Sequence, residues 1–190
     1  MKYFKISISI LALVILIFLA VQISGTRILP NLLGANITGN TSLSTSTDET
    51  LLSQRAPSFD LPDLSGNSVS LSKFINTPTI LIFWSTWDQA SIDQVKIVDD
   101  YLRGGNKDTS LVSFLAIDSQ EDQSVVKSLI KRGGYAIPFA LDTYGDVSNS
   151  YHIKSLPTVY FIDRGGVVRE IYAGILSQNM LVNKAEQIMK

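Results

Sequence analysis

Hydrophobic and polar positions divide the chain into three parts. Residues 6–23 form an apolar run without a charge, interrupted by only two serines and a glutamine. Residues 25–55 are rich in Gly, Asn, Ser and Thr and have no sustained period, which is typical of a flexible linker. From residue 56 to 190, short apolar runs alternate with amphipathic helical patterns, which indicates one folded domain.

The first apolar run has the properties of a membrane span. It has about 18 residues, which at about 1.5 Å per residue is enough to cross a hydrocarbon core of about 30 Å. Lys2 and Lys5 precede it and only Arg27 follows closely, so the positive-inside rule places residues 1–5 in the cytoplasm. We therefore expect residues 6–24 to be a signal-anchor helix that holds the protein in the cell membrane with its C-terminal domain outside the cytoplasm.

Two points about this N-terminal part stay open. A cleaved signal peptide would instead leave the domain secreted, although no small-x-small cleavage site directly follows the run. The linker of about 31 residues would span about 30 Å, which holds a domain near the membrane but not against it. Asn36 and Asn40 each begin a glycosylation sequon, whose use depends on the host.

The domain pattern predicts a mixed α/β fold. Residues 59–71 read as a β-hairpin, and Thr79–Trp84 reads as a central strand covered on both faces, since it lacks charge and glycine. A helix is expected from Asp88 to about Arg103. Further strands are expected at residues 111–117, 138–141, 158–162 and 167–172, and further helices at 121–132, 145–152 and 178–189. Right-handed crossovers give a parallel core and the last hairpin adds antiparallel strands, with helices on both faces of the sheet.

Composition removes several classes of function. The chain has no cysteine, which excludes disulfides, thiolate metal sites and thiol nucleophiles. A net charge of −1 argues against a nucleic-acid partner, which needs a basic stripe. No phosphate-binding loop, nucleophile elbow or zinc pattern occurs, so we expect no metal and no cofactor. His152, the sole histidine, is interpreted as a surface loop residue.

Three segments carry a family resemblance. Residues 56–66, Ala-Pro-Ser-Phe-Asp-Leu-Pro-Asp-Leu-Ser-Gly, come first; Leu81–Trp87 follows; and Leu156–Asp163, Leu-Pro-Thr-Val-Tyr-Phe-Ile-Asp, comes last. In this order they resemble the opening, the strand before the Cys-x-x-Cys motif and the cis-proline segment of the redoxin branch of the thioredoxin-like superfamily. That branch includes the membrane-anchored TlpA/ResA-type thiol-disulfide proteins and the AhpC/TSA group. The resemblance covers residues 56–190 and implies a thioredoxin fold with an N-terminal β-hairpin extension, behind one transmembrane helix.

The departure from the family is as informative as the match. Asp88 and Ser91 stand at the positions of the Cys pair. A carboxylate cannot form a mixed disulfide, and an unactivated hydroxyl is a much poorer nucleophile than a thiolate. Ile82 occupies the position where thioredoxins carry a buried acid. We therefore expect no catalytic residue, and a role as a binding or scaffold module.

The alternative is a thiol-disulfide oxidoreductase or peroxiredoxin-type antioxidant in cell redox homeostasis. Its own chemistry would then be lost or supplied by a partner protein.

The old active-site groove is the candidate binding site, for a partner protein or an extended peptide. Asp88 is either a helix N-cap or an acid that faces the partner, and Trp87 either covers the core edge or anchors the partner. Pro157 either maintains the fold or marks a segment that pairs with peptide backbone. A hard-cation site of Asp88 with Asp93 or Asp142 is also conceivable, although the spacing is not diagnostic. The complete candidate set is Trp84, Trp87, Asp88, Leu156, Pro157 and Thr158.

Overall fold

The computed structural model describes residues 51–104 and 111–190. The predicted membrane span, most of the linker and both glycosylation sequons lie outside these residues. Among the helices of the described part, none has the length and hydropathy needed to cross a membrane.

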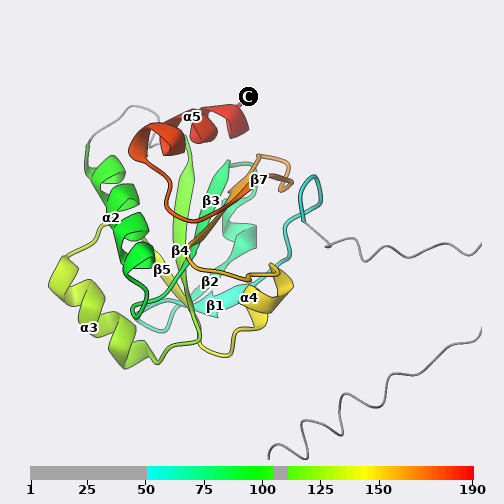
Figure 1. The fold of residues 1–190 in the computed structure, drawn as a ribbon. Helices are drawn as coiled ribbons and strands as arrows, with labels where there is room; N and C mark the ends of the chain where they lie inside the picture. Colours follow the sequence, from blue (N-terminus) through cyan, green and yellow to red (C-terminus); the bar gives the residue numbers. More distant parts are fainter. Residues whose placement is uncertain (1–50, 105–110) are drawn as a thin grey trace, which may run out of the picture. The chain divides into compact units, whose positions relative to one another are not determined.

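Five strands form one mixed sheet in the order β5-β4-β3-β6-β7 (Figure 1). These strands are β3 (Thr79–Trp84), β4 (Ser113–Ser119), β5 (Phe139–Asp142), β6 (Thr158–Ile162) and β7 (Val168–Ala173). β3 is central, with β4 and β5 parallel to it on one side and β6 and β7 antiparallel on the other. β1 (Asp60–Pro62) and β2 (Ser68–Ser70) form a separate hairpin. The predicted mixed sheet with its N-terminal hairpin is thus confirmed.

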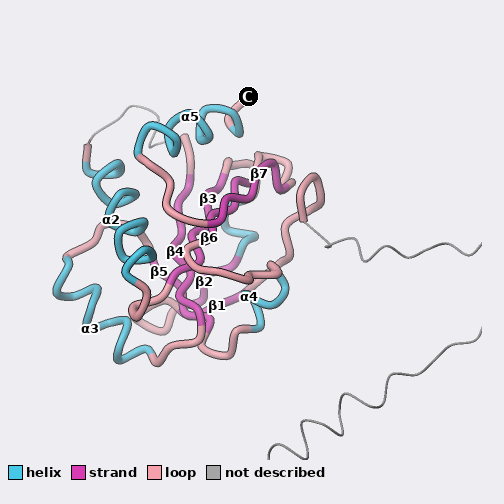
Figure 2. Tube along the Cα trace, viewed as in Figure 1, coloured by secondary structure: helices cyan, strands magenta, loops and turns pink. Residues whose placement is uncertain are grey.

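Helices cover both faces of the sheet, as predicted. They are η1 (Leu71–Phe74), α2 (Gln89–Arg103), α3 (Gln123–Gly133), α4 (Asp146–Ser150) and α5 (Gln178–Ile188). Side chains of α2, α3 and α5 pack into one hydrophobic core, and side chains of α4 and the N-terminal segment pack into a second. Figures 1 and 2 show α2 and α4 on opposite sides of the sheet.

The alternation of β3 side chains explains why this strand is apolar from Ile80 to Trp84. Ile80, Ile82 and Trp84 enter the core under α2 and α5, whereas Leu81 and Phe83 enter the core under α4. All six residues of the strand are buried. Because neighbouring side chains of a strand point to opposite faces, a polar residue anywhere in β3 would enter one of the two cores.

The folded domain begins earlier than the pattern predicts. Leu51 is buried, the backbone N–H of Ser53 donates to the Val168 carbonyl at 2.8 Å, and Arg55 forms an isolated bridge with Val167. These contacts belong to the domain although residues 51–55 are polar enough to resemble the linker. The described fold therefore begins five residues before the predicted boundary at residue 56.

A buried carboxylate ties α2 to the loop that follows α3. Asp99 is 5% exposed. Its Oδ1 accepts from the backbone N–H groups of Ala136 and Ile137, the latter at 3.2 Å, and its Oδ2 accepts from Arg103 Nε at 2.6 Å. This one side chain satisfies two backbone donors that would otherwise be without a partner.

Substitution of Asp99 by Ala should therefore destabilise the domain. We expect Asp99→Ala to lower the free energy of unfolding by about 3 kcal/mol, because it leaves buried donors unpaired. The neighbouring Asp100→Ala removes an exposed carboxylate and should change it by less than about 0.5 kcal/mol. Urea unfolding followed by circular dichroism measures both; equal losses in the two variants would contradict the role of Asp99.

Candidate functional site

The candidate site lies at the carboxyl end of β3. The loop of residues 85–88 leads from β3 into α2, and the cis Leu156–Pro157 peptide leads into β6. The two segments adjoin because Phe83 and Thr158 are cross-strand partners. β4 ends at the same edge, where Asp118 is paired with Trp84. We call these segments together the Asp88 site.

The two positions of the family's Cys pair are linked by a hydrogen bond. Oδ2 of Asp88 accepts from the backbone N–H of Ser91 at 2.8 Å, so Asp88 is the N-cap of α2. The carboxylate satisfies one of the free donors of the first helical turn, and its negative charge is favourable at the helix N-terminus. Ser91 is fully buried. Its hydroxyl is thus enclosed rather than presented to a substrate.

The remaining candidate residues differ in what they can contact. Trp87 is 72% exposed at the tip of the loop, whereas Leu156, which precedes β6, is half-buried and packs against the second core. Pro157 and Thr158 are buried, and Thr158 Oγ1 donates to the Ser155 carbonyl at 2.7 Å.

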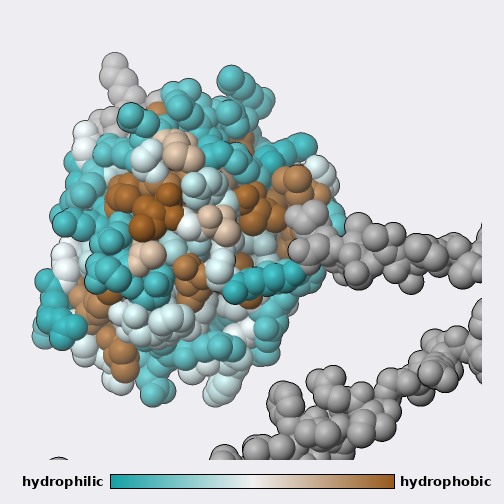
Figure 3. Space-filling model, viewed as in Figure 1, coloured by the Kyte–Doolittle hydropathy of each residue, from teal (hydrophilic) through white to brown (hydrophobic). Residues whose placement is uncertain are grey.

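Trp84 does not line the groove. It is fully buried and packs on Phe139, with ring centroids 5.4 Å apart. Its side chain therefore belongs to the core beneath the loop and not to the exposed surface. On the face shown in Figure 3, hydrophobic residues form separate patches between polar ones.

A carboxylate that the sequence analysis missed holds the loop in place. Glu121, which follows β4, accepts hydrogen bonds from both the backbone N–H and the hydroxyl of Thr86. Thr86 immediately precedes Trp87. The bidentate contact therefore fixes the loop that carries the exposed indole. The sequence offered one indication of this contact, an acid shortly after a parallel strand. The carboxyl ends of parallel strands meet at one edge of the sheet, so such an acid lies close to the loop after β3.

A second acid lies buried beneath the loop. Asp118 is fully buried, and its carboxyl group lies against that of Glu121. Burial raises the pKa of Asp118 to about 8, and the contact with the Glu121 carboxylate and the charge of Asp142 add to the rise. Asp118 is thus protonated at neutral pH, which avoids an isolated charge in the core.

Several other buried side-chain atoms have no hydrogen-bond partner in the described part of the chain. They are Trp84 Nε1, Ser85 Oγ, Ser91 Oγ and Gln94 Nε2. Gln94 uses its other amide atom to accept from the Leu176 backbone N–H at 2.6 Å. The buried interior of the domain thus includes polar side chains as well as the apolar ones of the two cores.

The conceivable cation site is not assembled. Asp88 caps α2, Asp93 accepts from Gln89 Nε2 at 2.9 Å, and Asp142 accepts from the backbone N–H groups of Val147 and Ser148. Each carboxylate serves a different local structure. Within residues 51–104 and 111–190, no group of three or more His, Asp or Glu side chains is placed to hold a metal ion.

Comparison with known proteins supplies the family. The model of the AhpC/TSA family matches residues 52–171. The chain belongs to the AhpC/TSA family. The chain has no cysteine, which is consistent with the replacement of the family's Cys pair by Asp88 and Ser91.

Its similar relatives bear names of thiol-disulfide proteins. The thiol-disulfide oxidoreductase ResA of Bacillus thuringiensis subsp. konkukian is 30% identical over 122 residues, which are 63% of this chain and 69% of the relative. The ResA of Geobacillus kaustophilus is 29% identical over 137 residues, 70% of this chain and 75% of the relative. The thioredoxin-like protein YneN of Bacillus subtilis is 23% identical over 133 residues, 70% of this chain and 78% of the relative.

Solved structures share the fold of this AhpC/TSA domain. StoA from Bacillus subtilis aligns with a TM-score of 0.60 and 21% identity over 68% of this chain and 96% of its own. The exposed lipoprotein thioredoxin Etrx1 of Streptococcus pneumoniae aligns with a TM-score of 0.62 and 20% identity over 69% of this chain and 99% of its own. Both likenesses support the thioredoxin-like fold predicted from the sequence.

Because the pKa of Asp118 is raised in the folded domain, we expect the stability of the domain to depend on pH. Between about pH 4 and pH 8 the unfolded chain releases the Asp118 proton while the folded domain retains it. The free energy of unfolding should therefore fall as pH rises through this window, by several kcal/mol at about 1.4 kcal/mol per pKa unit. Asp118→Asn removes this titration, so it should make the fall between pH 5 and 8 markedly shallower in urea unfolding experiments.

Asp122→Asn provides the matched control for this prediction, since Asp122 is an exposed acid in the loop that follows β4. It should keep the wild-type slope. The interpretation of Asp118 is wrong if Asp118→Asn and Asp122→Asn depend on pH in the same way as the wild-type protein.

Proposed function

We propose that this protein is a non-catalytic binding module, anchored in the cell membrane, whose Asp88 site holds an extended segment of a partner protein outside the cytoplasm. The observation that carries the proposal is the Asp88–Ser91 hydrogen bond. It supports the proposal because Asp88, which the family resemblance aligns with a nucleophilic cysteine, acts as a helix cap.

The loop has the properties of a prepared binding surface. Trp87 projects from a segment that Glu121 fixes on one side and the α2 N-cap fixes on the other. A large aromatic side chain on a rigid backbone loses little entropy on binding, which favours its use as an anchor. The cis-proline segment lies beside it, and the family resemblance implies that such a segment pairs with peptide backbone.

The proposed location follows from the N-terminal sequence. Residues 6–24 supply the apolar length of a signal-anchor helix, and Lys2 and Lys5 supply its orientation. The similar structure Etrx1 is described as an exposed lipoprotein. This chain has no cysteine to carry a lipid, so the helix would serve as its anchor.

The names of the relatives favour a second candidate function, a part in thiol-disulfide exchange. Because this chain has no sulfur that can form a mixed disulfide, it would have to position a partner that carries the thiols. Such a role would still use the Asp88 site for binding, and it differs from the first in the nature of the partner.

The absence of redox chemistry can be tested by restoring the thiols. The full-length wild-type chain should not accelerate insulin reduction by dithiothreitol, because a carboxylate and an enclosed hydroxyl cannot exchange with a disulfide. The double variant Asp88→Cys with Ser91→Cys should gain turnover, since a thiol at a helix N-terminus has a lowered pKa. Turnover by the wild-type protein would sink the proposal of a non-catalytic module.

The groove can be tested in the host membrane. Crosslinking and pull-down of the anchored protein should capture a partner, and Trp87→Ala should reduce the captured amount at least about tenfold, as expected for a binding anchor. Leu111→Ala removes an exposed apolar side chain (48% exposed) that precedes β4, at the other end of the sheet, and should leave capture unchanged. Equal capture by the wild-type protein, Trp87→Ala and Asp88→Ala would exclude the groove.

A further inference from the structure

A second concave surface lies at the opposite end of the sheet. A pocket of about 440 Å³ is lined by Thr79, the first residue of β3, and by Ile162, the last residue of β6. Thr79 and Trp84 are five residues apart on β3, so the pocket lies about 17 Å from the Asp88 site. It is therefore a separate feature, and its volume falls within the range of small-molecule sites, about 300 to 1,000 Å³.

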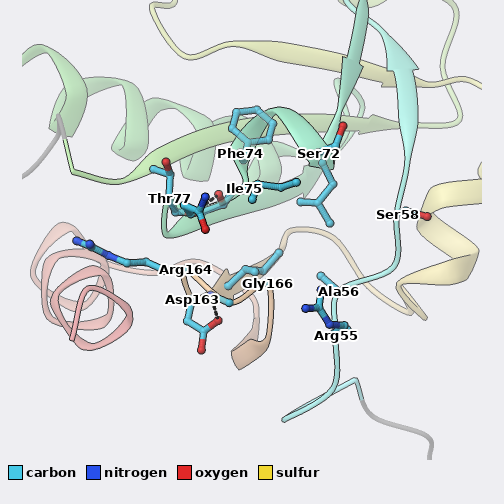
Figure 4. Close-up of a pocket in the computed structure, with 15 residues that line it drawn as sticks. Arg55, Ala56, Ser58, Ser72, Phe74, Ile75, Thr77, Asp163, Arg164 and Gly166 are labelled. Carbon is cyan, nitrogen blue, oxygen red and sulfur yellow. Dashed lines mark hydrogen bonds between the residues drawn. The ribbon is translucent and has the colours of Figure 1, made fainter.

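One side of the pocket is apolar. Leu71 and Phe74 of η1 line it together with Ile75, which follows η1. Ile75 is 67% exposed, whereas Leu71 and Phe74 pack against the second core. In Figure 4, Ile75 and Thr77 lie across the pocket from Asp163 and Gly166 of the β6–β7 turn. An exposed isoleucine at the mouth offers contact to the apolar part of a ligand.

Two arginines line the pocket without a partner. Arg55 and Arg164 lie toward opposite ends of it in Figure 4, and within the described residues neither guanidinium makes a hydrogen bond or an ion pair. Arg55 Nη1 reaches over the β6–β7 turn, 3.7 Å from the position that a Cβ on Gly166 would occupy. By contrast, Arg103 and Arg169 are each paired with an aspartate at 2.6 Å.

The carboxylate in the pocket does not neutralise these two charges. Asp163 Oδ1 accepts from the backbone N–H groups of Gly165 and Val167 at 2.8 and 2.9 Å, and Oδ2 accepts from Arg169 Nε. Although burial opposes it, these hydrogen bonds and the Arg169 charge hold the pKa of Asp163 below its ordinary value. Asp163 is thus an ionised structural group of the turn, and the pocket keeps an excess of positive charge.

We propose that this pocket binds a small organic anion, an oxyanion on a short aliphatic body. The oxyanion pairs with Arg55, whose planar fork of donors fits carboxylate and phosphate oxygens. The aliphatic body lies against Phe74 and Ile75, and Arg164 adds positive potential from the other end. This inference is independent of the proposed function, because it uses neither Trp87 nor the cis-proline segment.

Ligand-observed nuclear magnetic resonance on the full chain in zwitterionic micelles can test the proposal with hexanoate, butyl phosphate and the neutral hexanamide. Saturable binding is expected for one or both anions and not for hexanamide, and the stronger anion identifies the head group. Arg55→Gln should weaken that binding at least about tenfold, since a charge-assisted pair is lost. Arg132→Gln removes an exposed arginine of α3, outside the pocket, and should leave it unchanged.

Three results would overturn the proposal. The first is no saturable binding of either anion, and the second is equal binding by the Arg55→Gln and Arg132→Gln variants. The third is equal competition by inorganic phosphate, because the apolar wall would then contribute nothing. Circular dichroism of each variant establishes that it is folded, and Arg164→Gln, whose side chain lies at the other end of the pocket, provides a second, independent loss of charge.

Discussion

Burial of β3 on both faces is the constraint on which the rest of the domain depends. The strand delivers its side chains alternately to two cores, and neither core closes without it. It also sets the positions of both surfaces described above, since the pocket lies at its first residue and the Asp88 site at its last. A shift of β3 by one residue would turn every one of its side chains to the opposite face of the sheet. The register of the strand therefore fixes the positions of both surfaces.

The position of the buried acid under the loop distinguishes this domain from a thioredoxin that has lost only its thiols. Thioredoxins carry a buried acid at the position of Ile82, on the central strand, according to the family resemblance. Here the central strand has no ionisable residue, and the buried acid is Asp118 on the neighbouring strand β4. Asp118 is the cross-strand partner of Trp84. An ionisable group thus remains beneath the loop although the nucleophile above it is a helix cap.

The sequence predicted the elements well where local chemistry decides them. β6 begins at Thr158 and ends at Ile162 as predicted, because its apolar run is short and sharply bounded; the N-cap role of Asp88 was one of two interpretations and is the one observed. Long-range contacts were not predictable. Thr86 and Glu121 are 35 residues apart, and no periodicity links a threonine in one loop to a glutamate in another.

The ends of the domain and the burial of single side chains could also not be predicted from the local sequence pattern. Leu51 joins the core from a stretch that reads as linker, since Leu51 and Leu52 are a single apolar pair between polar residues and show no period. Trp84 and Trp87 both stood in the candidate set, although Trp84 closes the strand that was predicted to be covered on both faces; Trp84 is fully buried and Trp87 is 72% exposed. The alternation of side chains along β3 places the Trp84 side chain in the core. The turn into α2 exposes the Trp87 side chain. Neither can be resolved without the sheet register.

The hydrogen bond between Asp88 and Ser91 also determines how the protein responds to its surroundings. A cysteine pair at these positions has an oxidised and a reduced form, and the loop above it can differ between them. A carboxylate cap has no such pair of states, so the start of α2 keeps one arrangement whatever the ambient thiol balance. The surface that Trp87 presents would then be constitutive, offered alike in an oxidising and in a reducing compartment.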